Sequence, residues 1–321
     1  MIIDLYKKFK STFFEQINLV PELSIIVAIS GGQDSICLIK LIEDIKKTKY
    51  ILKVEYVYID HQWKQDSKYH INHLINLINS FKQKISIYQI KSVTSSENKA
   101  RTIRYQILTK HAFVYEYNTL ITAHTNTDKI ETFFQLLLRG SSLEGITSLN
   151  MCSQLNEKLY IFRPLIKASR LETACFCRNF SLPIWSDISN YNYSTYRNRI
   201  RYELIPYLCQ FFGIQTIDNL SSFLSITHLE NEYIKQNTLK LYLITRHNKY
   251  IALNYMIIKK QHNTIQIRIL YIFFYHNFNI VLNKEIMYKI LYYFNNNTNY
   301  IEIIKYHKIK VNLHFNWLYI N

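Results

Sequence analysis

A short glycine-containing loop between an apolar strand and an apolar helix constrains this chain more than any other feature. Residues 23–29 are apolar and rich in β-branched side chains, which predicts a strand buried on both faces. Residues 36–42 suit a helix packed against that strand. Two glycines between them allow a tight turn and a close approach to an anion, which the amides at the helix start favour. The predicted phosphate-binding loop consists of Ser30, Gly31, Gly32, Gln33, Asp34 and Ser35.

Two features of this loop limit its interpretation. It lacks the Gly-Lys-Ser/Thr ending of the loop found in kinases and GTPases, so no lysine reaches the terminal phosphates. The alternative is an ordinary Gly-Gly turn capped by Asp34 or Ser35. The position of the loop between a strand and a helix favours nucleotide binding.

Strand-like and helical segments alternate after the loop. Residues 51–60, 85–91 and 119–124 have strand patterns, whereas residues 69–82 and 99–117 have a helical period. This alternation predicts an α/β fold with a parallel five-stranded sheet and flanking helices. Ligands bind such sheets at the carboxyl ends of the strands. The best motifs lie at those ends, with Asp60 and His61 after the second strand and His124 after the fourth.

The chain changes character near residue 215. All nine glycines and prolines lie at or before Gly213, and none follows it. Residues 214–245 and 265–293 read as helices, whereas residues 299–320 alternate like strands. We therefore predict a catalytic domain over residues 1–215 and a smaller, mainly helical domain over residues 216–321, which supports the first or binds RNA.

The net charge and the cysteines restrict the partners and the compartment. Lys+Arg exceed Asp+Glu by 39 − 23 = 16, which suggests a polyanionic partner, nucleic acid first. The alternative is drift in an AT-rich plastid or reduced bacterial genome, because Ile, Asn, Lys, Tyr and Phe are all abundant. Five cysteines without a Cys-x-x-Cys pair indicate free thiols in a reducing compartment. Residues 269–282 are too few and too polar for a membrane span.

Four further segments occur in a fixed order after the loop. They are residues 58–61 (Tyr-Ile-Asp-His), residues 97–105 around Arg101 and Arg104, residues 123–140 from His124 to Gly140, and a last set at 163–165, 187–190 and 196–201. Together with the loop they resemble the tRNA(Ile)-lysidine synthetase family, within the superfamily of enzymes that cleave ATP between the α and β phosphates. The resemblance covers roughly residues 23–210. It implies a fold like that of the adenine nucleotide α-hydrolases.

The resemblance implies a ligase that forms a carbon–nitrogen bond. Such enzymes transfer AMP from ATP to C2 of the wobble cytidine in an isoleucine tRNA with a CAU anticodon. Free lysine then displaces the AMP, which changes the codon read from AUG to AUA. The implied partners are ATP, Mg²⁺, lysine and this tRNA, without a membrane, in a plastid stroma or a bacterial cytoplasm. The oligomeric state stays open, a homodimer being one option.

The resemblance also implies roles for individual residues. The catalytic set is Asp34, Arg104, His124, Asp128 and Glu131. ATP would bind the loop together with Asp60 and His61, and Asp34 would either hold Mg²⁺ or contact the incoming lysine. Lysine would bind Asp128 and Glu131, which share one helical face. The tRNA would bind Arg139, Arg197, Arg199 and Arg201. For each carboxylate or arginine, the alternative is an ordinary solvated helix face.

Three positions depart from the family pattern, and three rival functions remain. Thr125 stands where a histidine is usual, Thr127 where an acid is usual and Lys129 where a glutamine is usual. One rival is cytidine 2-thiolation, which normally requires Cys-x-x-Cys pairs. A second is amide formation, as in NAD and GMP synthetases, which lack an arginine segment of this kind. The third is a non-catalytic RNA-binding protein, which the departures permit.

Overall fold

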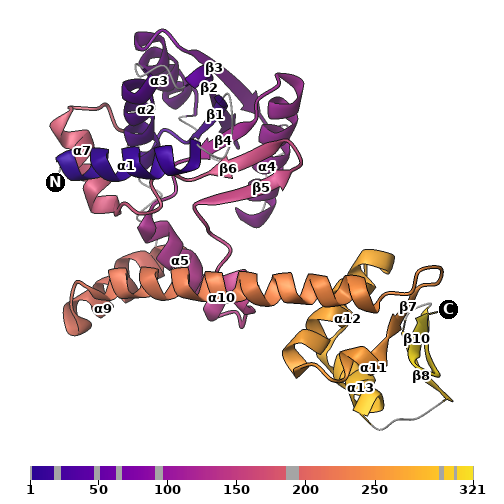
Figure 1. Ribbon diagram of the computed structural model, residues 1–321. Coiled ribbons are helices and arrows are strands. Elements are labelled where there is room, and N and C mark those ends of the chain that lie inside the picture. Colours follow the sequence, from indigo (N-terminus) through magenta and orange to yellow (C-terminus); the bar gives the residue numbers. More distant parts are fainter. Residues whose placement is uncertain are drawn as a thin grey trace. The chain divides into compact units, whose positions relative to one another are not determined.

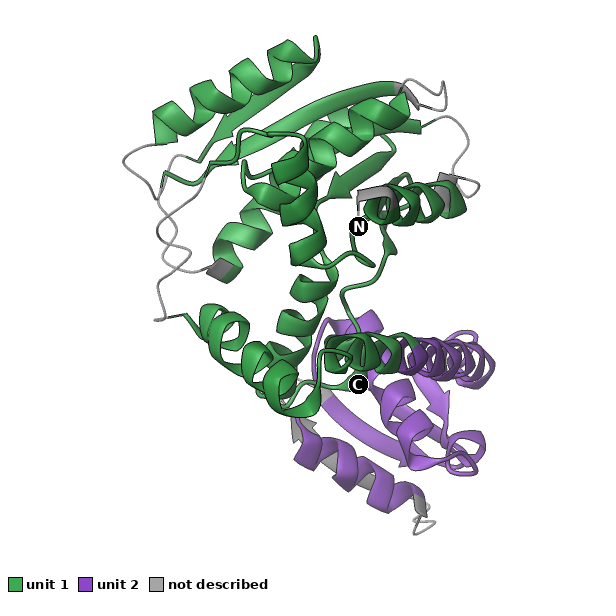
Figure 2. Ribbon diagram, turned by 90° about the vertical axis from the view of Figure 1, so that its left-hand side faces the viewer, with its two compact units in different colours: residues 1–225 green, residues 226–321 purple. Residues whose placement is uncertain are grey.

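The computed structural model describes residues 2–17, 23–46, 51–62, 67–90, 97–185, 195–295, 300–306 and 309–320. Residues 187–190 of the motif series therefore lie outside the described residues. Contacts divide the chain into two compact units, Met1–Ser225 and Ile226–Asn321 (Figure 2). The division falls within one long helix, α10 (Thr216–Thr245).

The first unit is built on a six-stranded sheet with the order β3-β2-β1-β4-β6-β5 (Figure 1). The strands are β1 (Leu23–Ile29), β2 (Ile51–Asp60), β3 (Lys84–Gln89), β4 (Thr119–Thr122), β5 (Cys152–Asn156) and β6 (Leu159–Phe162). Five of them run parallel, as predicted, and β5 adds an antiparallel edge strand through a hairpin with β6. The α/β fold class is confirmed, with one strand more than expected.

Alternation along β1 produces two apolar layers. Ile25, Val27 and Ile29 are buried with residues of α1 (Ile2–Ile17), α2 (Gln33–Lys46) and α7 (Arg170–Asn179). Ile26 faces the other way and is buried with Leu108 of α4 (Glu97–Val114). The β1 strand therefore has apolar cover on both faces, as an almost uninterrupted apolar run requires. Because β1, β2 and β4 are parallel, their carboxyl ends meet at one edge of the sheet.

The remaining helices of the first unit are α3 (Ser67–Ser80), which packs on the sheet and lies between β2 and β3 in the chain, and those that follow β4 and lead into α10. The latter are α5 (Asn126–Leu137), α6 (Leu143–Ile146), α8 (Tyr196–Arg199), a π-helical turn (Ile200–Leu204) and α9 (Ile205–Phe212). Helices α3 and α4 begin two residues before the predicted ranges. Gly213 separates α9 from α10 at a φ of 91°, a conformation that favours glycine.

The second unit has its own apolar core. A sheet of order β7-β10-β9-β8 is formed by Ala252–Asn254, Trp317–Ile320, Ile309–His314 and Tyr300–Tyr306, respectively. It accompanies α11 (Tyr255–Ile258), α12 (Asn263–Phe278) and α13 (Lys284–Asn295). The prediction of continuous helix over 265–293 is wrong, because Asn279 adopts a left-handed conformation that ends α12. No helix within the described ranges is long and apolar enough to cross a membrane.

Candidate active site

The loop at residues 30–35 is closed on itself by serine contacts. The backbone N–H of Ser30 donates to Ser35 Oγ at 3.1 Å, and the two serine hydroxyl oxygens lie 2.9 Å apart. Helix α2 begins immediately, with the N–H of Ile36 donating to the carbonyl of Gly32 at 3.0 Å. The amides of the first turn therefore lie at the carboxyl edge of the sheet, which suits an anion.

Gly31 occupies a position where any side chain would be strained. Its φ is 73°, and a Cβ atom built there would lie 2.0 Å from Nε2 of His70 on α3. His70 is itself buried, with its Nδ1 3.2 Å from the Tyr58 hydroxyl. The loop therefore packs directly against an imidazole, which sets how far its backbone can retreat from a ligand.

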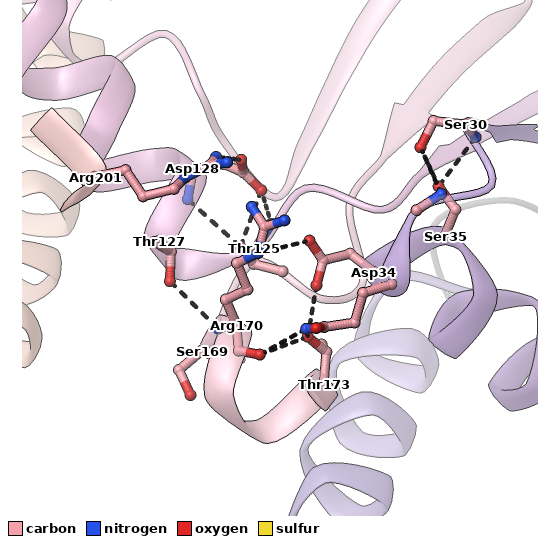
Figure 3. A network of polar contacts seen from close by, with 12 residues as sticks. Ser30, Asp34, Ser35, Thr125, Thr127, Asp128, Ser169, Arg170, Thr173 and Arg201 are labelled. Atoms are coloured by element: carbon pink, nitrogen blue, oxygen red, sulfur yellow. Dashed lines mark hydrogen bonds and ion pairs between the residues drawn. The ribbon is translucent and has the colours of Figure 1, made fainter. Parts of the chain in front are cut away.

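Asp34, at the start of α2, is held by the first turn of α7. The hydroxyl of Thr173 donates to Asp34 Oδ1 at 2.5 Å, and Nε of Arg170 lies 3.9 Å from Oδ2 (Figure 3). The neighbouring Gln33 donates from its amide to the Arg170 carbonyl at 2.9 Å. Burial raises the pKa of Asp34, against the opposing effects of Arg170 and Thr173. A carboxylate that is buried despite the free-energy cost of desolvation is typical of a functional site.

Helix α5 carries a pair of carboxylates, Asp128 and Glu131. Thr125 caps the helix, and its backbone N–H and its hydroxyl each donate to Asp128 Oδ2 at 2.9 Å. Asp128 and Glu131 are both buried, and Glu131 has no exposed surface. Burial by itself would raise the pKa of Asp128, but Arg197 beside it keeps that pKa below its ordinary value.

Two of the predicted tRNA-binding arginines contact these carboxylates. Arg197 donates to Asp128 at 2.8 Å and to Glu131 at 2.9 Å, and Arg201 donates twice to Glu131, at 2.5 and 2.7 Å. Arg199 points elsewhere and pairs with the exposed Glu203 at 3.1 Å. The segment from 197 to 201 thus combines a partly buried pair of guanidinium groups with an exposed one. This arrangement was not predicted.

The last predicted tRNA-binding residue lies apart from this cluster. Arg139 is exposed in the turn that follows α5. Its exposure is compatible with a contact to a polyanion.

His124 lies between β4 and α5. Its Nδ1 is 2.8 Å from the Thr122 hydroxyl. Burial, with smaller contributions from nearby arginines including Arg163, lowers the pKa of His124 to about 4, although Asp128 opposes the shift. The imidazole is therefore neutral at pH 7 and can donate one hydrogen bond and accept another.

A third group of polar side chains follows β2. Asp60 is buried and accepts the N–H of Gln62 on Oδ1 at 2.9 Å, whereas its Oδ2 has no hydrogen-bond partner within the described residues. Beside it, Nε2 of His61 lies 3.2 Å from Nη2 of Arg104 on α4. A buried carboxylate oxygen without a donor at the sheet edge suits a ligand hydroxyl or amine.

The sequence is closely similar to known proteins over almost its whole length. The PP-loop domain family matches residues 5–208. The chloroplastic tRNA(Ile)-lysidine synthase of Gracilaria tenuistipitata var. liui is 45% identical over 325 residues, which cover 98% of each chain. The corresponding protein of Pyropia yezoensis is 38% identical and covers 87% of this chain and 85% of its own. This chain belongs to the tRNA(Ile)-lysidine synthase family.

A solved structure supports the fold of this family member. The U34-tRNA thiolase NcsA from Methanococcus maripaludis superposes with a TM-score of 0.58 at 14% identity, over 70% of this chain and 78% of its own. At this identity the likeness concerns the fold alone.

The family departures have structural roles in this lysidine synthase relative. Thr125 forms a reciprocal cap with Asp128, and the Thr127 hydroxyl accepts the backbone N–H of Arg170 at 3.3 Å. Lys129 donates to the Ser221 carbonyl at 3.3 Å, at the start of α10. Thr127 and Lys129 thus link α5 to α7 and α10, respectively.

Sequence reasoning missed the contribution of α7. Arg170 and Thr173 lie 136 and 139 positions after Asp34, so no local pattern connects them to the loop. One local signal was available, because Ser169 and Glu172 form the capping box that predicts a helix start. A helix predicted there would have placed Arg170 in a first turn.

The residues at the loop fit a divalent cation of the Mg²⁺ type. Asp34 supplies carboxylate oxygens next to the predicted phosphate position. In the described part of the chain, no group of three or more His, Cys, Asp or Glu forms a cage for a metal ion. Mg²⁺ commonly binds through one carboxylate together with substrate phosphates and water, which matches this donor set.

Proposed function

We propose that this protein is a tRNA(Ile)-lysidine synthase that joins free lysine to C2 of the wobble cytidine in a tRNA with a CAU anticodon. ATP is the second substrate, and AMP and pyrophosphate are the products. One observation carries the proposal. The loop acid Asp34 is connected through the first turn of α7 to Thr127 of α5, the helix that carries Asp128 and Glu131 (Figure 3).

The loop would bind ATP. Its amides and serine hydroxyls would receive the pyrophosphate, and Asp60 with His61 would contact the adenosine. Arg104, 3.2 Å from His61, would contact the phosphate that is transferred. A Mg²⁺ ion on Asp34 would neutralise charge on the phosphates as the α–β bond breaks. Transfer of AMP to the C2 oxygen of cytidine makes that oxygen a good leaving group.

The α5 cluster would bind lysine. Free lysine carries two ammonium groups and a carboxylate, and the cluster offers both carboxylates and guanidinium groups for them. Asp128 and Glu131 would bind an ammonium, whereas Arg197 and Arg201 would bind the lysine carboxylate or the tRNA backbone. Arg197 holds the pKa of Asp128 low, so this side chain stays ionised and paired, and a lysine ammonium would share or displace that guanidinium. Neutral His124 would accept a hydrogen bond near the amine that attacks C2.

The rival thiolation chemistry has little support in the cysteines. All five cysteines are free, and Cys37 and Cys177 are both buried. Contact with Cys177, together with burial, raises the pKa of Cys37, so it stays a thiol. A thiol of this kind is a poor sulfur carrier. The relatives named chloroplastic support a plastid location for the lysine-transferring enzyme.

The decisive experiment supplies the purified protein with ATP, Mg²⁺, labelled lysine and an unmodified isoleucine tRNA transcript with a CAU anticodon. We expect label in the tRNA together with stoichiometric AMP and pyrophosphate. Release of AMP without lysine transfer would indicate another nucleophile. Binding of tRNA without any ATP cleavage would contradict the proposal and favour the non-catalytic RNA-binding alternative.

Two variants separate the half-reactions. Asp34→Ala should reduce adenylation by at least about 10²- to 10³-fold, the loss seen when one preorganised group at developing charge is removed. Glu131→Ala should chiefly reduce lysine transfer, so the adenylated tRNA accumulates and can be isolated. Equal loss of both steps in Glu131→Ala would refute this division of roles.

A further inference from the structure

An open groove runs along the outer face of α4 where the helix approaches the end of β5. It has a volume of about 710 Å³, and its lining includes Arg101, Tyr105, Gln106, Lys110 and Phe113 of α4 together with Asn156 of β5. Arg101 and Tyr105 are four residues apart, as are Gln106 and Lys110, so these side chains form one stripe on the helix. From Arg101 to Phe113 the helix rises about 18 Å.

Of the groove side chains, Tyr105 packs against the core of this face of the sheet, whereas Arg101, Lys110 and Phe113 are exposed. Leu108 and Ala112 of α4 pack under the sheet and are almost fully buried. Phe113, by contrast, is 77% exposed. The Arg101 guanidinium lies 5.8 Å from the centre of the Tyr105 ring. The exposed Phe113 ring has no evident structural purpose in the folded unit.

The chemistry of the groove suits one strand of RNA. Two of the eight lining residues are cationic and none is acidic, so a polyanion is favoured over an acidic or neutral protein surface. Threonine, asparagine and glutamine side chains donate to phosphates and riboses. An exposed aromatic ring can stack on a base of any sequence.

One end of the groove adjoins the active site. Arg104, one turn of α4 from Arg101, contacts His61 at the sheet edge. Arg101 is also near enough to His124 for its charge to act on that imidazole. An RNA strand lying in the groove would therefore lead directly to the position of the target base.

We propose that the α4 groove binds the RNA strand adjoining the target cytidine, with phosphates at Arg101 and Lys110 and a base stacked on Phe113. The proposal rests on the proposed function, because it assigns a contact surface to the same tRNA substrate. It adds a binding surface that lies on a different element from the arginines at 197–201.

The test uses the full chain and the unmodified tRNA transcript, in variants that avoid the active-site residues. Lys110→Glu reverses the charge in the groove, and Phe113→Ala removes the ring. Lys7→Glu makes the same charge change on α1, which covers the opposite face of the sheet. Phe113→Tyr keeps an aromatic ring. For each variant, the dissociation constant for tRNA is measured from about 50 to 500 mM salt (one decade), beside the KM for ATP.

We expect Lys110→Glu to weaken tRNA binding about tenfold and to reduce the slope of log K against log salt by about 0.7 to 0.9, as one lost phosphate contact would. Phe113→Ala should weaken tRNA binding by roughly tenfold without changing this slope. Phe113→Tyr, which keeps an aromatic ring, should bind tRNA as the wild type does. The KM for ATP should stay unchanged, and Lys7→Glu should resemble the wild type.

Unchanged tRNA affinity and slope in both groove variants would overturn the proposal, even if the wild type transfers lysine. A wild type that binds tRNA but does not transfer lysine would refute the proposed function, whereas the groove would still be judged by the variants. A change in sedimentation of Lys110→Glu with unaltered tRNA affinity would assign the groove to a second copy of the chain and would also overturn it.

Discussion

The two units differ in what they bury. In Met1–Ser225 the buried side chains include five acids, two separate histidines and one arginine: Glu43, Glu55, Asp60, His70, His111, Asp128, Glu131 and Arg163. In the described residues of Ile226–Asn321 the buried polar side chains are uncharged: Thr227, Asn231, Thr238, Thr245 and Gln266. The core of that unit is otherwise aliphatic and aromatic.

This difference shows where the chain accepts the cost of desolvating charge. A buried ion pair seldom adds net stability compared with an apolar pair of similar shape. Such groups persist mainly where their chemistry is needed. Of these groups, Asp60, Asp128 and Glu131 lie at the candidate site, whereas Glu43 and Glu55 pair with buried tyrosines elsewhere in the first unit. The second unit shows the composition of an interior built for stability. The predictions that follow test this contrast.

The largest effect on stability is expected from the α5 cluster. Glu131→Gln removes the buried charge that faces two guanidinium groups, so the free energy of unfolding should fall by about 3 kcal/mol or more. Urea unfolding measures this loss. The matched control is Glu203→Gln, which breaks the exposed pair with Arg199 and should cost at most about 1 kcal/mol. Similar losses in the two variants would mean that burial of the cluster is unimportant.

A substitution in the second unit should lower stability and spare the chemistry. Leu270→Ala empties a fully buried site of the apolar core and should cost about 2 to 5 kcal/mol in unfolding free energy. The rate of adenylation per folded molecule, measured well below the new unfolding temperature, should stay within a factor of two, roughly the error of such comparisons. A large rate loss in the folded variant would show that the second unit takes part in the reaction.

The units should also differ in their response to pH. The unfolded chain protonates His124 near pH 6.5, whereas the folded protein does so only near pH 4, so this group makes the folded state less stable as the pH falls from about 6.5 to 4. In His124→Gln this decline should be smaller. Urea unfolding at several pH values measures the difference. Asp34, whose pKa is raised, acts in the opposite direction because its protonation favours the folded state, so the variant comparison is needed.

Hydrogen exchange can assign the pH effect to a unit. Free energies of opening, corrected for the intrinsic pH dependence of exchange, should decline between pH 6.5 and 4 for amides of β4 and α5. Amides of α12, among buried side chains without charge, should change less. An equal decline in both units would show that the two unfold as a single cooperative body.

The smallest effect is expected at the cap of α5. Thr125→Ala removes the capping hydroxyl and should cost about 0.5 to 2 kcal/mol in unfolding free energy. Because that hydroxyl also donates to Asp128, the KM for lysine should rise as well. Thr195→Ala, at the exposed cap of the short α8, is the matched control and should change stability less. An unchanged KM in Thr125→Ala would mean that the contact only caps the helix.

Sequence patterns predicted the secondary structure well where neighbouring residues alone determine where an element begins and ends. The β1 and β2 strands have the predicted bounds, because β-branched runs next to glycine or charged residues leave few alternatives. The break at Asn279 was missed, because a left-handed asparagine in an apolar helix gives no glycine or proline signal. The helix at the start of the chain and the β5 hairpin were also not predicted.

The candidate site was only partly accessible to sequence reasoning. The motif residues Asp34, Asp60 and Asp128 lie at strand ends or first turns, so their common edge follows from the parallel topology. Their partners do not, since Arg201 pairs with Glu131 across 70 positions and Thr173 reaches Asp34 across 139. Such contacts depend on tertiary packing, which a local pattern cannot encode. The individual roles of these residues stay predictions.

The close packing of Gly31 against His70 restricts how this loop can change during evolution. Any side chain at position 31 meets two independent obstacles, the imidazole at 2.0 Å and a backbone φ of 73°. Shrinking His70 would remove the first obstacle and leave the second. A single compensating substitution is therefore insufficient, and an ancestor with alanine at this position would have needed a loop of different shape. Position 31 should tolerate no replacement in a saturation library, even when position 70 is varied with it.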